Sequence, residues 1–498
     1  MVMFNMFKKN KKEISIQDRI KGSLYGFLVG DALGVPVEFV SRNELKIKPV
    51  KDMIGFGTHN QPKGTWSDDS SMILATIDSM YNNQDTFLSD NIINYNDLME
   101  RFLNWKLKSD YTPHGRLFDI GNSTSDALSK YQNNKNHVFC GADNINSNGN
   151  GSLMRILPIS LYTYFCRYES YISVVLSDNY DVIKNISSLT HSHVLSIMSC
   201  YIYSYLINEY LKTIDINKAY ENTRNHFKLI FEGKINKDYG NINDNKEYFN
   251  RLIYNDISTL EKKDIKSSGF VVDTLEASIW CVLTSNSYKD AVLKAVNLGD
   301  DTDTIGALTG ALAGLIYGIK DIPTNWLNQL QRKVYLDEMI NKYLYLLDLR
   351  KEQTKKEREQ SILKYKEDLK KHRSIKATKD SWKNIPIGSI VKEFDINIIL
   401  SKEDMELIKL GHIPYEMEDH WFMYVDEEEK TINYYRSWTG IQAYKAYYKE
   451  DEKVTIYKLI VNKDENAFRY REKEDDTYII NRFKEHIQSE IKCHKFSD

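Results

Sequence analysis

Two stretches of this chain carry glycine at every fourth position of a helical pattern, and this feature restricts the fold more than any other. The first runs from Ile16 to Leu33, where apolar residues recur at helical spacing, and the second follows Gly299. Glycine costs roughly 1 kcal/mol per helical position relative to alanine, so repeated glycines indicate that close backbone contact offsets a real penalty. We expect the second helix to pack tightly against a neighbour, and the first to leave a groove for a helix or a ligand. The glycines are Gly22, Gly26, Gly30 and Gly34, then Gly306, Gly310, Gly314 and Gly318.

Acidic and hydroxyl side chains gather at the predicted starts of two helices. One group lies in the stretch 299–304, directly before the second glycine-bearing helix, and the other lies in 67–69, before an apolar helix face. Capping and the helix dipole explain one such residue, but two adjacent aspartates exceed what capping requires. The combined set is Ser67, Asp68, Asp69, Asp301, Asp303 and Thr304, which contains no His or Cys. All-oxygen donors suit Mg²⁺, Mn²⁺ or Ca²⁺ rather than Zn²⁺, and four carboxylates brought together would require bound cations.

Three further segments offer polar groups next to predicted helix ends. Glu38 follows a helix that ends at Pro36, which makes it a candidate general base, with a solvated surface glutamate as the simpler alternative. The segment 147–155 is a glycine-flanked turn before a helix, an arrangement that presents backbone N–H groups to an anion. His191 could contact a substrate, although histidines in such positions more often cap or pack.

Composition excludes several classes of function. With 498 residues the chain predicts two or more domains, and its formal charge of −3, from 67 basic and 70 acidic residues, gives no footprint for nucleic acid. The five scattered cysteines form no CxxC pair, which argues against disulfides and a thiolate zinc site. The basic N-terminus lacks an apolar signal region, and residues 305–319 are too short to cross a bilayer. We expect a cytoplasmic protein without a membrane partner.

Four motifs in one order resemble those of the ADP-ribosylglycohydrolase family. They are Gly30-Asp31-Ala32-Leu33-Gly34, Gly64-Thr65-Trp66-Ser67-Asp68-Asp69-Ser70, Gly149-Asn150-Gly151-Ser152-Leu153-Met154-Arg155 and Gly299-Asp300-Asp301-Thr302-Asp303-Thr304. The resemblance covers about residues 16–345. It implies an all-α fold with a binuclear Mg²⁺ centre, or Mn²⁺ in its place, which cleaves the bond between the anomeric carbon of ADP-ribose and an attached group.

The resemblance also implies roles for single residues. The metal ligands would be Ser67, Asp68, Asp69, Asp301, Asp303 and Thr304, although many relatives have threonine where Ser67 stands. Glu38 falls where ADP-ribosylserine hydrolases carry their catalytic glutamate, and either Glu38 or Asp303 would serve as general base. The substrate-binding residues would be Gly121, Asn150, Gly151, Ser152 and His191.

The remainder of the chain predicts a second domain. We expect a tail at 1–15, the helical domain at 16–347, a charged helical linker at 348–380 and a small α+β domain at 381–498. Within the last, the acidic turn 426–430 between two aromatic and β-branched runs indicates a hairpin. Five residues there suggest either a face that stacks a base and binds phosphate or, the favoured interpretation, a compact core with Arg436 in an ion pair; they are His420, Trp421, Arg436, Trp438 and Thr439.

Together these features predict a hydrolase that acts on an ADP-ribosylated protein or on an ADP-ribose-containing small molecule. The alternatives are hydrolysis of a free ADP-ribose-derived nucleotide and a catalytically silent protein that binds ADP-ribose. The C-terminal domain would bind or select the modified target. The sequence does not identify the acceptor to which ADP-ribose is linked.

Overall fold

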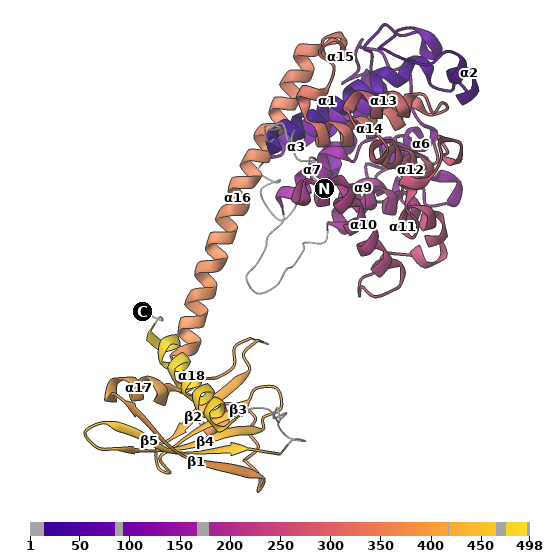
Figure 1. Cartoon of the computed structure of the whole chain (residues 1–498). Coiled ribbons are helices and arrows are strands. Elements are labelled where there is room, and N and C mark those ends of the chain that lie inside the picture. The colour runs from indigo at the N-terminus through magenta and orange to yellow at the C-terminus, as the bar shows by residue number, and fades with distance from the viewer. Residues whose placement is uncertain (1–13, 85–92, 167–178, 417, 465–474, 496–498) are drawn as a thin grey trace. The chain divides into compact units, whose positions relative to one another are not determined.

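Helices α1 (Ile16–Gly34) and α14 (Thr302–Tyr317) lie side by side in the N-terminal part of the chain (Figure 1). Their glycines face one another, because a Cβ atom added to Gly26 would lie 2.2 Å from the carbonyl oxygen of Gly310. A Cβ on Gly30 would lie 2.1 Å from the carbonyl oxygen of Gly306. The predicted close packing is therefore confirmed, and each glycine-bearing helix is the neighbour of the other.

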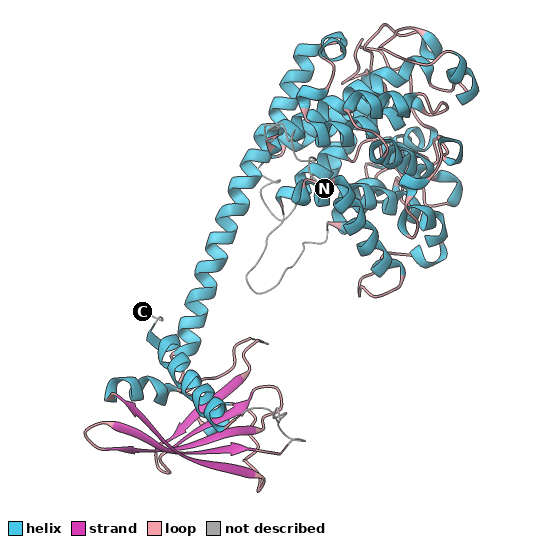
Figure 2. Cartoon of the chain, in the orientation of Figure 1, coloured by secondary structure: helices cyan, strands magenta, loops and turns pink. Residues whose placement is uncertain are grey.

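The computed structural model describes residues 14–84, 93–166, 179–416, 418–464 and 475–495. They form two compact units, Met1–Glu357 and Arg358–Asp498. The first is built of helices and the second contains a sheet (Figure 2), in the order that the sequence predicted. Across the described segments, no helix combines the length and the apolar character needed to span a bilayer.

The α1–α14 pair is part of one large hydrophobic core in the N-terminal unit. Trp66, Trp105 and Trp326 are fully buried in it. The other α-helices of this unit are α2 (Arg42–Ile47), α3 (Asp68–Asn82), α5 (Tyr95–Lys108), α6 (Asn122–Asn134), α7 (Leu157–Phe165), α8 (Tyr180–Ser188), α9 (Val194–Thr213), α10 (Ile216–Phe231), α11 (Asn250–Ile253), α12 (Val271–Leu283), α13 (Tyr288–Val296) and α15 (Thr324–Gln329). Three short 3₁₀ turns also matter for the site: η1 (Val35–Val37), η2 (Gly57–His59) and η5 (Asn150–Ser152).

One long helix, α16 (Lys333–Arg373), contributes to both units. Its buried side chains, from Leu336 to Leu347, all lie in the first half. The second half carries mixed charges, with the division between the units after Glu357. The predicted boundaries at 347 and 380, and the role of this stretch as a linker, stay predictions.

The C-terminal unit is an antiparallel sheet of five strands with order β1-β5-β4-β3-β2. The strands are β1 (Val391–Leu400), β2 (Trp421–Asp426), β3 (Thr431–Arg436), β4 (Gln442–Glu450) and β5 (Val454–Asn462). The predicted hairpin is confirmed, since Asp426 pairs with Thr431 at the turn between β2 and β3. Two helices, α17 (Lys402–Leu410) and α18 (Asp476–Lys495), complete an α+β arrangement. The apolar residues of α18 pack against the sheet through Phe483, whose ring centroid lies 5.9 Å from that of Tyr434.

The aromatic face predicted in this unit divides into buried and exposed parts. Trp421 is half-buried, and its ring packs 4.7 Å from that of His486 on α18. Arg436 lies over the Trp421 ring at 4.9 Å, a cation–π contact, and the described residues give it no partner for the expected ion pair. Trp438 is 63% exposed. The core interpretation therefore fits Trp421, whereas Trp438 lies at the surface.

Candidate active site

The two acidic helix starts meet in space. Thr304 Oγ1 at the start of α14 donates to Asp69 Oδ1 at the start of α3, over 3.4 Å. Asp69 and Asp303 are almost fully buried, and Asp68 is only 8% exposed. The sequence could not establish that the two acidic motifs are close in space. Their proximity makes them parts of one candidate site.

The end of α1 holds both starts in place. Asp31 is fully buried and accepts hydrogen bonds from the Ser67 N–H (2.9 Å), the Ser70 N–H (3.1 Å) and Ser70 Oγ (2.5 Å). Gly34 packs against α14, where a Cβ would lie 2.3 Å from the Asp303 Cα. The glycine contact between α1 and α14 therefore also fixes the metal-ligand candidates on either side of it.

Glu38 belongs to the same cluster. It follows η1, is only 6% exposed, and offers a carboxylate oxygen within 4.8 Å of oxygens of Asp301 and Asp303. The simpler sequence interpretation, a solvated surface glutamate, is therefore wrong. The reason is tertiary: the Phe39 N–H donates to the Asp300 carbonyl (2.6 Å), and this bond joins the loop that carries Glu38 to the start of α14.

Burial and mutual repulsion dominate the electrostatics of the cluster. Burial, followed by neighbouring carboxylates, raises the pKa of Asp68, Asp69 and Asp303 well above the ordinary aspartate value. Burial raises the pKa of Asp31 to about 6 and that of Glu38 to about 7. Several carboxylates thus share one buried space, an arrangement that cations would stabilise.

Two polar residues that the sequence analysis did not name as site residues border Glu38. His59 Nε2 lies 2.5 Å from Glu38 Oε2, and a carboxylate oxygen of Asp119 lies within 4.8 Å of both. Neither residue lies in a motif with acidic spacing. Asp31 was also missed as a site residue, although an acid within a glycine-bearing apolar helix is a usable signal, because it must find partners.

The loop 149–152 approaches the cluster through one side chain. Asn150 Nδ2 donates to Asp301 Oδ2 (2.6 Å) and to Thr274 Oγ1 (3.0 Å). A Cβ on Gly151 would lie 2.8 Å from His191 Cε1, so the buried His191 ring supports this loop. Burial and nearby Arg155 lower the pKa of His191 to about 3, so its imidazole is neutral at pH 7.

The other predicted substrate residues lie in different surroundings. Ser152 is fully buried, and its Oγ accepts from Ser187 Oγ at 3.0 Å and from Cys200 Sγ at 3.5 Å. Its side chain therefore holds the interior of the loop. Gly121 is exposed at the start of α6, with open space where a Cβ would stand. Contacts of these positions with a substrate stay predictions.

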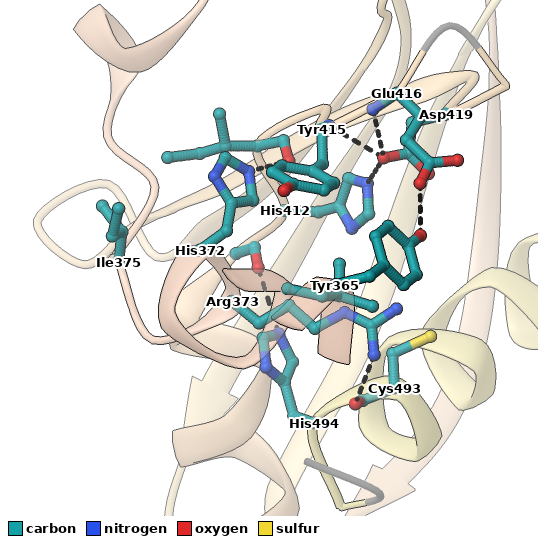
Figure 3. A pocket seen from close by; sticks show the side chains of 13 residues that line it. Tyr365, His372, Arg373, Ile375, His412, Tyr415, Glu416, Asp419, Cys493 and His494 are labelled. Carbon is teal, nitrogen blue, oxygen red and sulfur yellow. Dashed lines mark hydrogen bonds and ion pairs between the residues drawn. The ribbon is translucent and has the colours of Figure 1, made fainter. Parts of the chain in front are cut away.

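A separate pocket lies within the C-terminal unit (Figure 3). Three of its basic side chains contact carbonyl oxygens: His372 Nε2 lies 2.9 Å from the Ile413 oxygen, Arg373 donates to that of Cys493 (3.3 Å), and His494 Nε2 lies 3.1 Å from that of Gly411. A fourth, His412, lies 3.9 Å from a carboxylate oxygen of Asp419. Asp419 accepts from the Tyr415 N–H at 2.8 Å. Because these groups satisfy one another's hydrogen bonds, their arrangement stabilises the local fold and indicates no class of ligand.

Comparisons with known proteins place this site in a family. The model of the ADP-ribosylglycohydrolase family matches residues 12–356. ADP-ribosylarginine hydrolase Tri1 of Serratia proteamaculans (strain 568) is 30% identical over 331 residues, which cover 66% of this chain and 80% of that protein. ADP-ribosyl-(dinitrogen reductase) glycohydrolase of Rhodospirillum rubrum is 28% identical over 325 residues, which cover 64% of this chain and 92% of that protein.

A solved structure agrees with these sequence matches. An ADP-ribosylglycohydrolase-related protein complex superposes with a TM-score of 0.51 at 25% identity, over 67% of this chain and 99% of that chain. The matched region contains both acidic helix starts, Glu38 and the 149–152 loop. This chain is therefore an enzyme of the ADP-ribosylglycohydrolase family.

Proposed function

We propose that the protein hydrolyses the bond between ADP-ribose and an arginine side chain of a modified protein, at a binuclear Mg²⁺ centre. The observation that carries the proposal is the meeting of the α3 and α14 starts, which buries Asp69 and Asp303 and leaves Asp303 within 4.8 Å of Glu38. Support for arginine as the acceptor comes from two relatives, from Serratia proteamaculans and Pseudomonas putida, that are named ADP-ribosylarginine hydrolases.

The residues present fit a pair of hard divalent cations. Within the part of the chain that the structure describes, Asp69 Oδ2 is buried without a hydrogen-bond partner, a costly state for a carboxylate that a cation would relieve. The surrounding donors are carboxylates and hydroxyls, which suit Mg²⁺ or Mn²⁺. The proposed ligands are Ser67, Asp68, Asp69, Asp301, Asp303 and Thr304. Bound cations would supply Lewis-acid polarisation next to the anomeric carbon and hold the hydroxyls of the distal ribose.

The chain's own groups supply positioning and proton transfer. We assign Glu38 as the general base, because its buried carboxyl lies within 4.8 Å of the proposed ligands Asp301 and Asp303. Glu38 takes a proton from the attacking water, whose oxygen bonds to the anomeric carbon while the bond to the guanidino nitrogen breaks. The departing arginine nitrogen takes up a proton from solvent, and Glu38 then returns to solvent the proton that it received, so that the carboxylate is regenerated. The transition state resembles an oxocarbenium ion. Asn150 holds Asp301 in orientation through its amide.

A panel of defined linkages tests the proposed substrate. The full-length protein is incubated with Mg²⁺ and an arginine-linked ADP-ribosyl peptide, a serine-linked one, and a free ADP-ribose derivative. Released ADP-ribose is quantified by chromatography. We expect the arginine linkage to be cleaved fastest, by ~100-fold or more in kcat/KM, which corresponds to about 2.7 kcal/mol of discrimination. Preferential cleavage of the free derivative would favour a nucleotide hydrolase, and binding without turnover would contradict an enzymatic role.

A further inference from the structure

The turn η2 packs directly over the turn that carries Glu38. Gly57 has φ of 68°, and a Cβ on it would lie 1.8 Å from the carbonyl oxygen of Pro36 in η1. Only glycine therefore permits this approach. Two turns that are about twenty residues apart in sequence are held in backbone contact next to the acidic cluster.

The residues after Gly57 bond to both ends of Glu38. Thr58 Oγ1 donates to the Glu38 carbonyl oxygen over 2.6 Å, and His59 Nε2 lies 2.5 Å from Glu38 Oε2. A glutamate side chain has three rotatable bonds, so a fixed main chain alone does not orient its carboxylate. The contact with His59 supplies the missing restraint on the side chain.

Two aromatic rings flank the His59 ring in turn. Its centroid lies 6.0 Å from that of Phe39 and 5.3 Å from that of Phe118, with both rings tilted against it. Phe39 has φ of 65°, a backbone conformation that is rare for a bulky residue and that costs free energy. Strain of this kind persists where the surrounding structure imposes it, often at a functional site. Here the backbone conformation of Phe39 places its aromatic ring beside His59.

Charge repulsion on the Glu38 carboxylate makes the restraint by His59 necessary. Carboxylate oxygens of Asp119 and Asp301 lie close to Glu38, and each like charge repels the Glu38 carboxylate. Because an ionised carboxylate can only accept, His59 Nε2 is the donor in its contact with Glu38 Oε2. We propose that His59 is a positioning residue that holds the Glu38 carboxylate in its catalytic orientation. This role rests on the proposed function, in which Glu38 is the base.

Two substitutions separate the hydrogen bond from the ring packing. His59→Phe keeps a ring between Phe39 and Phe118 but removes the donor, whereas His59→Gln keeps a donor of similar reach without the ring. With the arginine-linked substrate and saturating Mg²⁺, we expect His59→Phe to lower kcat by ~30-fold, since displacement of a catalytic group by ~1 Å can cost up to ~100-fold. KM should change by less than ~3-fold, and His59→Gln should recover most of kcat, because substrate binding is intact and the donor is restored.

A matched histidine controls for general effects of the exchange. His137 Nδ1 lies 2.7 Å from Asn96 Oδ1, and its ring stacks on Tyr95 at 5.5 Å. His137→Phe should leave kcat unchanged, and melting temperatures should show that all three variants fold.

Three results would overturn the role of His59. They are wild-type kcat in His59→Phe, equal loss in His59→Phe and His59→Gln, and a shift in the half-saturating Mg²⁺ concentration with unchanged kcat, which would make His59 a metal ligand instead. A wild-type protein without turnover would overturn the proposed function itself, and the role of His59 with it. The wild-type assay therefore distinguishes the two failures.

Discussion

At the scale of single residues, the site concentrates buried negative charge. Asp69 and Asp303 lie on different helices, yet the Thr304 hydroxyl next to Asp303 reaches Asp69. Both aspartates have a pKa raised by burial and by neighbouring carboxylates. Without cations, the carboxylates of this cluster repel one another and destabilise the fold. When cations are present, the same carboxylates bind them. Substitution of one ligand should therefore change stability and activity in opposite directions.

Asp303→Asn removes one buried charge while keeping the shape of the side chain. We expect the metal-free variant to melt at a higher temperature than the metal-free wild type, because repulsion falls. Turnover should drop by ~1,000-fold or more, since a metal site contributes several kcal/mol to transition-state stabilisation. Calorimetry in EDTA and the ADP-ribose release assay measure the two effects. Asp290→Asn, in the first turn of α13, is the control and should keep full activity; a metal-free Asp303→Asn protein less stable than wild type would contradict the account.

The raised pKa values give a signed prediction for pH. Because the folded-state pKa of Asp31 is about 6 and that of Glu38 about 7, above their unfolded values, the stability linked to them is present below about pH 4 and is lost as pH rises through 6 to 7. In EDTA the protein should therefore melt at a lower temperature at pH 8 than at pH 5.

A buried carboxylate outside the site shifts in the same direction, so the pH comparison needs a second arm. Burial raises the pKa of Glu276 on α12 to about 7. At pH 8, Mg²⁺ should restore only that part of the lost stability that comes from the acidic cluster. A melting temperature at pH 8 that Mg²⁺ leaves unchanged would exclude a cation at this site.

Many of the candidate site residues could be named from the sequence. The others could not, because tertiary contacts alone bring them to the site. Asp301 and Asp303 stand in a local acidic pattern that suggests ligands without a fold. His59 has no such pattern, and its contact with Glu38 exists only because Gly57 packs on Pro36. Two interpretations of Glu38 were open; burial by tertiary contacts excludes the solvated surface glutamate, and the general-base role stays a prediction.

At the scale of elements, the α1–α14 contact couples packing to chemistry. The glycine spacing predicted close approach, but the identity of the partner required the structure. The same contact ends at Gly34, against Asp303. In the C-terminal unit, the hairpin β2–β3 followed from its acidic turn, whereas β1 and β4 became recognisable only as strands paired with β5.

Gly26→Ala tests this packing away from the acidic cluster. The new methyl group would lie 2.2 Å from the Gly310 carbonyl oxygen, so the helices must separate. We expect a loss of ~1–3 kcal/mol in the free energy of unfolding, larger than the gain of roughly 1 kcal/mol in helix propensity. Denaturant titration measures it. Gly388→Ala, where the Cβ meets open space, should have little effect; equal stability of Gly26→Ala and wild type would contradict the close packing.

At the scale of the whole molecule, the site lies entirely within the N-terminal unit, and the family match ends at residue 356, next to the division after Glu357. We expect residues 1–357 alone to cleave an arginine-linked peptide with kcat within ~3-fold of the full chain, because all proposed ligands and Glu38 are retained. If the C-terminal unit binds the modified target, as the sequence predicts, KM for a whole ADP-ribosylated protein should rise on truncation while KM for the peptide stays the same. If truncation leaves KM unchanged for the whole protein as well as for the peptide, the C-terminal unit has no role in binding the target.

We propose that the acidic starts of α3 and α14 form one metal centre that cleaves ADP-ribose from its acceptor. Its most direct test measures release of ADP-ribose from an arginine-linked substrate by the full-length protein, in Mg²⁺ and after exchange into EDTA, beside Asp303→Asn. We expect turnover by the wild type in Mg²⁺, loss of that turnover in EDTA and its recovery when Mg²⁺ is returned. Turnover by Asp303→Asn in Mg²⁺ should be at least ~1,000-fold below that of the wild type in Mg²⁺. Equal turnover in Mg²⁺ and EDTA, or wild-type turnover in Asp303→Asn, would contradict the proposal.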